Sequence, residues 1–443
     1  MREMKDSGIP WIGEIPKDWN VKKLKFSCKL FGRIGFRGYT ADDLVEESEG
    51  AITLSPTNMN NFNLDYSKCS YLSWDKYYES PEIMVEVGDV LLVKTASVGK
   101  CSYVDYLPKE TTVNPQILVL KEHKDCSKFV TYLFHTSIGE AYIDTTKGGS
   151  TIYTISQEKI GNYEFAFPPF TEQQKIASFL DKKCAEVDEM IALQEQIIEE
   201  LKAYKQSVIT EAVTKGLNPD VPMKDSGIEW IGQIPEHWEV KPFKAYYKTT
   251  KGLNITKENL VERGVPVISY GQIHSKLNTG TSICDGLIRY VPETYLVSNP
   301  ECLSKKFDMF FADTSEDREG AGNMAFIDTD TPIFAGYHTI IARPKEEVKT
   351  KYFAYLTKTD AWRTQIRNSV SGVKVFSISQ KLINRAYIII PTPTEQQSIA
   401  DYLDKKCSEI DNLISIKLSK IDSLKEYKKS IIYEYVTGKK EVK

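Results

Sequence analysis

The chain has 443 residues, of which 41% are hydrophobic and 27% are charged, and it carries a formal charge of −4 at pH 7. This length predicts two to four domains, and eight cysteines without a CxxC pair, beside only five histidines, argue against zinc fingers and disulfide scaffolds. Because no apolar run reaches about 18 residues and the first residues lack a signal-peptide core, we expect a cytoplasmic protein with reduced thiols and no membrane partner.

The first predicted element is an arm, residues 1–22, and it recurs later in the chain. MKDSGIPWIGEIPKDWNVK occupies 4–22 and MKDSGIEWIGQIPEHWEVK occupies 223–241, with 14 of 19 positions identical. The second arm is therefore expected at 218–241. Matches of this length at a fixed offset identify an internal repeat, so the chain consists of two half-chains in tandem.

A variable segment follows each arm, at 23–168 and at 242–391, and the two segments have dissimilar sequences. Short apolar runs bounded by Gly, Pro and Asp predict strands at Val90–Val93, Ile117–Leu120 and Ile388–Ile390. Residues 127–143 and 350–367 have helical spacing. Each variable segment is therefore predicted to be a mixed α/β domain of about 150 residues.

A long helix follows each variable segment, at 169–217 and at 392–443, and begins in a near-identical TEQQ sequence. We expect capping boxes at Thr171 with Gln174 and at Thr394 with Gln397. A heptad-spaced apolar seam then predicts that the two helices pack together as an antiparallel coiled coil. Polar residues interrupt this seam at 194 and 205, and at 417 and 428. The apolar seam comprises Leu180, Val187, Ile191, Ile198, Leu201, Val208, Leu403, Ile410, Ile414, Ile421, Leu424 and Ile431.

Motifs of catalysis are missing from the sequence. It contains no GxxxxGK[ST] phosphate loop, no GxGxxG, no HExxH and no GxSxG. An ExK spacing typical of some metal nucleases occurs in PEHWEVK, but the duplicate arm replaces its glutamate by Asn20. His338 is expected to be a partly buried histidine or a polar binding contact rather than a catalytic base. We therefore predict no catalytic residue, no metal site and no cofactor in this chain.

The arrangement of these motifs resembles the specificity subunit of Type I restriction–modification enzymes. Two copies of SGIxWIGxIPxxW, two TEQQ entries into long helices and two dissimilar domains between them follow one another as they do in that family. The resemblance covers nearly the whole chain. It implies an α/β fold in which two target recognition domains are separated by two long antiparallel helices, with a pseudo-two-fold repeat.

The resemblance also implies a function and partners. Each recognition domain would read one half of a split, asymmetric duplex DNA target, and the paired helices would act as a spacer. The helices would also dock two methyltransferase subunits, and restriction/translocase subunits would complete the enzyme. S-adenosylmethionine, ATP and Mg would then belong to those partner subunits. A local excess of 21 basic over 15 acidic residues in 240–391 is compatible with a nucleic-acid surface.

Two other hypotheses remain open at this point. A coiled-coil scaffold that binds proteins without DNA specificity would not require its two duplicated domains to diverge, whereas a reader of an asymmetric target would. A fused nuclease or methyltransferase would require motifs that the sequence lacks. Divergent domains between near-identical arms therefore favour the specificity subunit.

Candidate DNA contacts lie in polar loops at strand ends and in Gly-containing loops, where the backbone can approach a phosphate closely. Arginines in the second domain offer bidentate donors. The candidate residues are Lys94, Thr95, Ser97, Lys147, Gly149, Ser150 and Thr151 in the first domain, and Thr314, Ser315, Arg318, Arg363, Arg367, Gly372 and Lys374 in the second.

Overall fold

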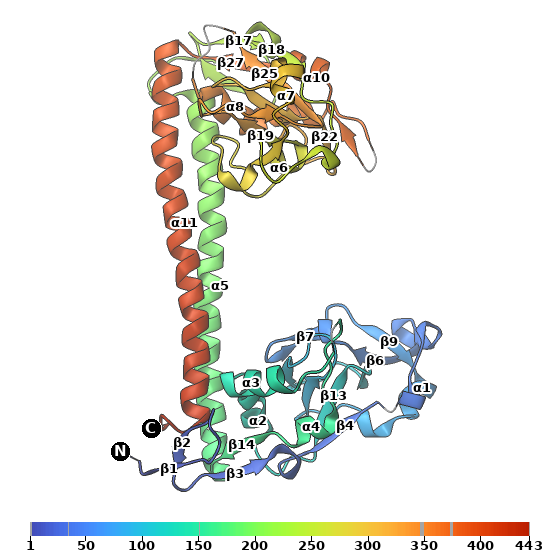
Figure 1. Cartoon of the computed structure of the whole chain (residues 1–443). Coiled ribbons are helices and arrows are strands. Elements are labelled where there is room, and N and C mark those ends of the chain that lie inside the picture. The colour runs from blue at the N-terminus through green and yellow to red at the C-terminus, as the bar shows by residue number, and fades with distance from the viewer. Residues whose placement is uncertain (1, 34, 150, 346–349, 373–374, 443) are drawn as a thin grey trace. The chain divides into compact units, whose positions relative to one another are not determined.

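The computed structural model describes residues 2–33, 35–149, 151–345, 350–372 and 375–442. The chain divides into two compact units, of which unit 1 comprises Met1–Glu195 with Leu418–Lys443 and unit 2 comprises Gln196–Lys417. Each unit combines one arm, one variable domain, the first part of one long helix and the last part of the other (Figure 1). The domain boundaries inferred from the sequence stay a prediction.

The variable domain of unit 1 is built on two sheets. The first has the strand order β11-β10-β13-β4 and is antiparallel throughout, whereas the second has the order β12-β6-β9-β5 and contains one parallel pair, β12 with β6. The strands are β4 (Lys29–Gly32), β5 (Leu44–Val45), β6 (Gly50–Leu54), β9 (Ser70–Ser73), β10 (Val90–Val93), β11 (Cys101–Tyr103), β12 (Thr111–Val113) and β13 (Ile117–Lys121), with a separate hairpin of β7 (Met59–Asn60) and β8 (Asn63–Leu64).

The variable domain of unit 2 repeats this plan with different residues. Its sheets have the orders β18-β25-β21-β23 and β20-β19-β24, again with one parallel pair, β19 with β24. The VLLV of β10 corresponds to the MFFA of β21, and all eight residues are buried. The strands are β18 (Tyr247–Lys251), β19 (Val265–Ile268), β20 (Arg289–Val291), β21 (Met309–Ala312), β23 (Met324–Phe326), β24 (Phe334–Ala335) and β25 (Thr339–Pro344).

Short helices cover these sheets, and two of the predicted helices are interrupted. Residues 127–143 form α2 (Ser127–Phe134) and α3 (Ser137–Thr146), because the Thr136 hydroxyl accepts the Gly139 N–H at 3.3 Å and caps a new helix. In unit 2, 350–367 likewise forms α8 (Tyr352–Lys358) and α9 (Asp360–Arg367). The remaining short helices are α1 (Trp74–Tyr78), α4 (Gln157–Gly161), α6 (Tyr270–Ile273), α7 (Tyr295–Ser298) and α10 (Gln380–Arg385).

Each arm packs on the end of the long helix that belongs to the other half-chain. Trp19 and Trp238 are fully buried, and a Cβ at Gly438 would lie 2.4 Å from Pro16, so only a glycine allows this approach without a shift. A two-stranded ribbon then joins the arm to the variable domain. The arm hairpins are β1 (Met4–Asp6) with β2 (Glu14–Pro16) and β15 (Met223–Asp225) with β16 (Gln233–Pro235), and the ribbons are β3 (Asn20–Lys23) with β14 (Glu164–Phe167) and β17 (Glu239–Pro242) with β27 (Tyr387–Ile390).

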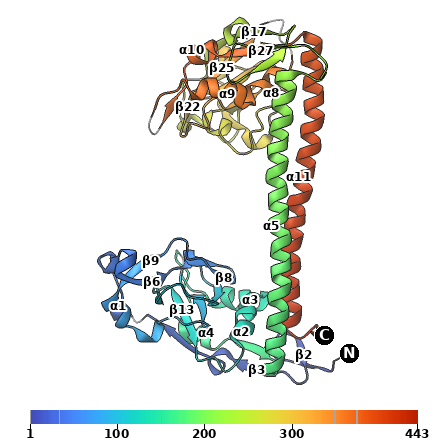
Figure 2. The same ribbon diagram turned by 180° about the vertical axis from the view of Figure 1, so that it is seen from behind.

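The long helices are α5 (Phe170–Lys215) and α11 (Pro393–Val436), and they are antiparallel within each unit (Figure 2). In unit 1, Lys428 Nζ lies 2.6 Å from Asp188 Oδ2, and in unit 2, Lys205 Nζ lies 2.6 Å from Asp411 Oδ2. The internal repeat relates these two ion pairs. The polar residues that interrupt the seam at 205 and 428 thus cross-link the helices. The apolar seam positions are buried or half-buried.

One expectation about the helices is wrong. The capping box of α11 is formed by Thr392 and Glu395, two residues earlier than predicted, with the Thr392 hydroxyl donating to Glu395 Oε2 at 2.7 Å. Outside the seam, Ile209 and Ile432 are only 1% and 5% exposed because the variable domains and arms pack over them. Among the described helices, none has the length and apolarity needed to cross a membrane.

Candidate nucleic-acid interface

Two polar loops of the first variable domain that are far apart in sequence form one surface. The loop after β10 pairs with the hairpin that precedes α4, through a bridge between Thr95 and Thr154 whose hydroxyl oxygens are 3.1 Å apart. The Ile155 N–H donates to the Lys94 carbonyl at 2.9 Å. We call the described residues of 94–97 and 147–155 the hairpin surface of unit 1.

Unit 2 builds the same framework. Thr314 and Ser315 form β22, which pairs with β26 (Phe376–Ser377), and the Ile378 N–H donates to the Asp313 carbonyl at 2.7 Å. The described residues of 313–315 and 371–378 are the hairpin surface of unit 2. The structure therefore joins, in each domain, the two loops that the sequence proposed as separate candidates.

The hydrogen-bond framework also identifies a third equivalent position, at the start of the neighbouring strand. The Lys94 N–H donates to the Gln116 carbonyl at 2.8 Å, and the Asp313 N–H donates to the His338 carbonyl at 3.1 Å. The backbone contacts are thus alike, but the side chains differ in charge and in hydrogen-bonding capacity. Lys94 and Gln116 occupy in unit 1 the positions that Asp313 and His338 occupy in unit 2.

Lys94 is half-buried, and burial lowers the pKa of its ammonium. Among the described residues, no side chain or carbonyl makes a hydrogen bond or ion pair with its Nζ. A partly desolvated amine without a protein partner is available to a ligand that accepts hydrogen bonds.

His338 is more exposed than the sequence suggested, and it has an acidic partner. Its side chain is 58% exposed, and Nδ1 lies 3.1 Å from Asp313 Oδ1. The Thr314 hydroxyl donates to the same carboxylate oxygen at 2.7 Å. The backbone of His338 has φ of +53°, a left-handed conformation that costs a non-glycine residue about 1 kcal/mol or more.

The glycines of the two hairpins have a structural reason. Gly149 and Gly372 have φ of +113° and +157°, and a Cβ at either would come within 2.2 Å or less of the carbonyl oxygen of Ile152 or Val375. Any other residue would therefore force the hairpin open. This requirement, rather than an approach to phosphate, accounts for the glycines. The hairpins expose Ile152 and Val375, at 62% and 50%, in equivalent positions.

The other candidates of the first domain lie on or beside this surface. Thr95 is half-buried, and Ser97 and Thr151 are exposed. Lys147 Nζ lies 2.7 Å from Asp144 Oδ1 and 4.9 Å from the centre of the Tyr153 ring. Ser150 and, in the second domain, Lys374 lie outside the described residues.

In the second domain, most candidate side chains are engaged within the protein. Ser315 is only 2% exposed, and Arg318 Nε donates to the Arg367 carbonyl at 3.0 Å. Arg367 bridges Asp360 and Glu319 at 2.8 and 3.1 Å, and Arg363 donates to the Glu319 carbonyl. Burial and the adjacent Arg367 lower the pKa of Arg363 to about 10. These contacts favour a structural role for the three arginines.

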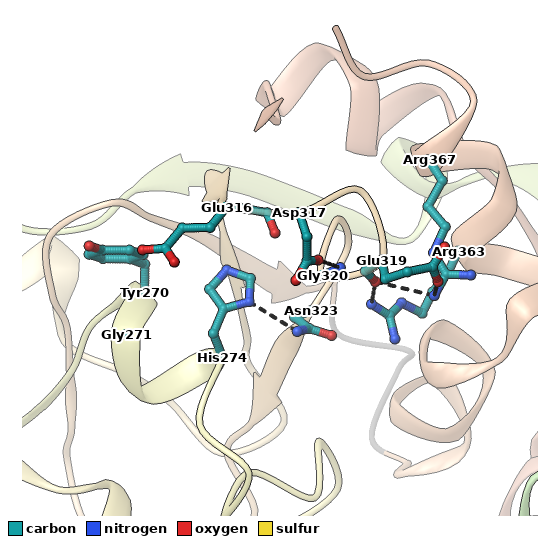
Figure 3. Close-up of a pocket in the computed structure, with 11 residues that line it drawn as sticks. Tyr270, Gly271, His274, Glu316, Asp317, Glu319, Gly320, Asn323, Arg363 and Arg367 are labelled. Atoms are coloured by element: carbon teal, nitrogen blue, oxygen red, sulfur yellow. Dashed lines mark hydrogen bonds and ion pairs between the residues drawn. The ribbon is translucent and has the colours of Figure 1, made fainter. Parts of the chain in front are cut away.

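An open pocket of about 610 Å³ has Arg363 and Arg367 on one side and Tyr270 and His274 on the other (Figure 3). Tyr270 and His274 line one side, and His274 Nδ1 lies 3.0 Å from Asn323 Nδ2. Acidic side chains of the loop 316–319 line the pocket as well, which makes it a poor site for a phosphate. No group of three or more His, Cys, Asp or Glu side chains that would suit a metal ion occurs within the described part of the chain.

Sequence reasoning missed two side chains of the interface, Gln116 and Ile152. The position of Gln116 becomes visible only through the backbone hydrogen bond from Lys94, because the two domain sequences do not align there. His338 was noticed in the sequence, but its partner Asp313 lies 25 residues away on a different strand end. Ile152 carries no sequence signal that marks it as exposed.

Comparisons with known proteins agree with this architecture. The family model of the Type I restriction modification DNA specificity domain matches residues 16–203 and 235–426. The MjaVIII specificity subunit of Methanocaldococcus jannaschii is 24% identical, over 97% of this chain and 94% of that protein. The EcoKI specificity subunit of Escherichia coli is also 24% identical, over 51% of this chain and 47% of that protein.

Two solved structures share the fold. A chain from a study of complex assembly and conformational transition of the type I R-M system has a TM-score of 0.70 and 14% identity, with 95% of this chain and 98% of that chain covered. The HsdS subunit of Thermoanaerobacter tengcongensis has a TM-score of 0.53 and 13% identity, with 96% and 98% covered. Since the family model matches most of both half-chains, the protein belongs to the Type I restriction modification DNA specificity family and carries two copies of its domain in tandem.

Proposed function

We propose that this chain is the non-catalytic subunit that gives a Type I restriction–modification enzyme its DNA sequence specificity. Each variable domain acts as a target recognition domain and binds one half of a split, asymmetric duplex target through its hairpin surface. One observation carries the proposal: the two domains present the same backbone framework with dissimilar side chains at 94 and 313 and at 116 and 338. Such a pair suits a protein that reads two different half-sites.

The physical basis is readout in the major groove. Base edges there carry a distinct pattern of donors, acceptors and methyl groups, whereas phosphate contacts fix only register and orientation. The two hairpin surfaces, together with the adjacent Gln116 and His338, offer ammonium, amide, imidazole, hydroxyl and exposed β-branched groups, as such readout requires. Lys147 and Thr151 are suitable phosphate contacts at the rim of the surface, since both reach solvent beside the hairpin.

The long helices offer a second kind of surface. Met190 and Leu193 in unit 1, and their repeat equivalents Leu413 and Ile416 in unit 2, are 46% to 55% exposed. Apolar groups exposed in a row on a helix mark an interface. We propose that each stripe docks one methyltransferase subunit, and that restriction/translocase subunits join this complex in the cytoplasm.

In this proposal the cofactors are bound by the partner subunits. Those subunits would bind S-adenosylmethionine, ATP and Mg, and carry out methyl transfer and DNA cleavage. The chain itself would only set where the partners act. Co-purification with a methyltransferase subunit in a one-to-two ratio is the expected assembly. A stable monomer that ignores such a partner would argue against the docking stripes.

The decisive experiment is sequencing of modified bases in cells that express this chain with its methyltransferase partner. We expect one split, non-palindromic motif. A single continuous motif, or a perfect palindrome, would contradict the assignment of one half-site to each domain.

Gel-shift binding tests the scaffold alternative. With the methyltransferase subunit present, the complex should retain duplexes that carry the motif and release duplexes in which either half-site is scrambled. Equal retention of both kinds of duplex would favour a protein-binding scaffold without DNA specificity.

A further inference from the structure

The two recognition domains differ most sharply at the position that follows the central strand of the first sheet. Lys94 occupies this position in unit 1 and Asp313 in unit 2, and each backbone N–H donates to the carbonyl of the residue that precedes the neighbouring strand. The same backbone thus presents a cation in one domain and a carboxylate in the other. Because the framework is equivalent, the difference lies in what the side chains recognise.

In unit 1 this position can only donate hydrogen bonds. An ammonium has three donors and no acceptor. Lys94 is half-buried, its pKa is lowered by burial, and it lacks a bonding partner among the described residues. Of the base edges in the major groove, guanine offers two adjacent acceptors, O6 and N7, which is the pattern that lysine reads most often.

In unit 2 the equivalent position presents acceptors. A carboxylate only accepts, so the hydrogen of the Asp313–His338 bond belongs to Nδ1, and in the Nδ1–H tautomer of the uncharged imidazole Nε2 is an acceptor. Tyr270 and Tyr337 pack edge-on against this ring at centroid distances of 5.5 and 6.2 Å. The ring is therefore oriented, yet 58% of the side chain remains exposed.

The backbone of His338 is unfavourable for stability, because it is left-handed at a residue that is not glycine. Residues held at such a cost cluster at functional sites, where the surroundings impose the conformation. Packing of the side chain does not explain this cost, because His338 is exposed. Among the described residues, Lys94 is partly desolvated and carries a free donor group beside the same framework.

We propose that these positions read bases with opposite hydrogen-bond polarity. Lys94 donates to a guanine in the first half-site, and His338, held by Asp313, accepts from the exocyclic amine of an adenine or a cytosine in the second. This inference rests on the proposed function and extends it to named bases. Gln116 lies beside Lys94 and is the second reader of the first half-site.

The test uses the full chain co-expressed with its methyltransferase partner, with the methylated motif as readout. Lys94→Met removes the charge but keeps the length of the side chain, and His338→Gly removes the ring and relieves the backbone. We expect Lys94→Met to accept any base at one guanine of the first half-site. We expect His338→Gly to accept any base at one adenine or cytosine of the second half-site.

Binding and stability are measured on the purified complexes. Each variant should weaken retention of the cognate duplex about 10- to 100-fold, the range for loss of one good base contact. The melting temperature should stay close to that of the unaltered complex, because neither side chain is part of the buried core. Loss of binding with a similar melting temperature separates a reader from a residue that only supports the fold.

Matched controls come from exposed ion pairs on the same domains. Lys29→Met breaks a pair with Glu122, and Lys306→Met breaks a pair with Asp330. Both should leave the motif unchanged. His338→Asn, which tolerates a left-handed backbone but is too short to place an acceptor where Nε2 lies, should behave as His338→Gly does.

The outcomes separate this inference from the function it rests on. If the unaltered complex shows no split motif, the proposed function is wrong. If it shows one but Lys94→Met and His338→Gly leave both half-sites unchanged, the function stands and the inference is overturned. A guanine at the position that His338→Gly relaxes would also overturn it, since the ring would then be a donor.

Discussion

At the scale of single residues, the two units place different titratable groups in equivalent positions at the end of a helix. His135 follows α2 in unit 1, and Lys358 ends α8 in unit 2. Burial lowers the pKa of both groups, and it lowers the pKa of His135 to about 4. His135 Nε2 donates to the Cys101 carbonyl at 2.9 Å, so the neutral ring is the form that fits the fold.

A pH dependence follows for unit 1. Because the folded pKa of His135 lies below the unfolded value near 6.5, the unfolded chain binds the proton first between pH 6.5 and 4. The contribution of His135 to the free energy of unfolding is fully present above pH 6.5. It falls by at most about 3 kcal/mol as the pH drops to 4. Chemical denaturation of the wild-type chain and of His135→Gln at pH 8, 6 and 4 measures this difference.

The variant should be less stable at pH 8, where it loses a hydrogen bond, and should lose less stability on acidification. Carboxylates that titrate in the same pH range contribute equally to both proteins. Their contribution therefore cancels when the two free energies of unfolding are subtracted. Parallel pH curves would show that His135 does not contribute.

Residues also show where reading the sequence reaches its limit. The arms and the TEQQ helices were predictable because the repeat preserves their residues. Lys94 was a candidate from the sequence as well, but its pairing with Gln116, and that of Asp313 with His338, was not predictable, because these pairings rest on backbone hydrogen bonds that leave no trace in sequence. Arg363 and Arg367 looked like free donors, but tertiary contacts with Glu319 and Asp360 engage them.

At the scale of elements, the long helices combine an apolar seam with two polar cross-links. Exposed ion pairs of this kind stabilise little, but a charged residue within an apolar seam penalises every pairing that leaves it without its partner. Only one antiparallel register gives both lysines a carboxylate partner, with Lys428 beside Asp188 and Lys205 beside Asp411. The polar residues that interrupt the seam were visible in the sequence. Their carboxylate partners were not predictable, because they depend on the register in which the two helices pair.

This register allows a clean test of the helices as spacers. Residues 192–198 and 418–424 lie between the two ion pairs, so removing both heptads keeps each pair and the seam in phase. The paired deletion shortens each helix by about 10 Å, which is about three base pairs of duplex. We expect the same two half-sites with a gap shorter by about that number, measured by sequencing of modified bases.

Deleting 192–198 from α5 only is the matched control. This deletion removes one heptad from α5 and leaves the facing heptad of α11 in place. The two ion pairs can then no longer form at the same time, so assembly should fail. An unchanged gap in a paired-deletion protein that still methylates would rule out a spacer role for the helices.

At the scale of the whole molecule, each compact unit contains parts of both half-chains. The first arm packs on the end of α11, and the second arm packs on the end of α5. The two units thus offer equivalent attachment points for a recognition domain. In unit 1 the Leu24 N–H donates to the Tyr163 carbonyl at 2.8 Å, and in unit 2 the Phe243 N–H donates to the Ala386 carbonyl at 2.7 Å.

These paired hydrogen bonds mark where the domains can be exchanged. Replacing 24–163 by 243–386, and the reverse, leaves both ribbons, both arms and both helices intact, since the cuts fall beyond β3, β14, β17 and β27. The exchanged chain should fold and bind its methyltransferase partner as the parent does. Circular dichroism and co-purification measure this first requirement.

The exchange should then move specificity with the domain. The attachment points are equivalent, so each domain should keep its own half-site in its own orientation, and the two half-sites should trade places on antiparallel strands. Both should remain methylated, because either domain would still lie beside a docking stripe. A folded, partner-bound exchange whose motif is unrelated to the parental half-sites would place specificity at the junction of domain and helix. Recovery of the parental half-sites in exchanged positions would show that specificity resides in the domains, where Lys94 and His338 lie.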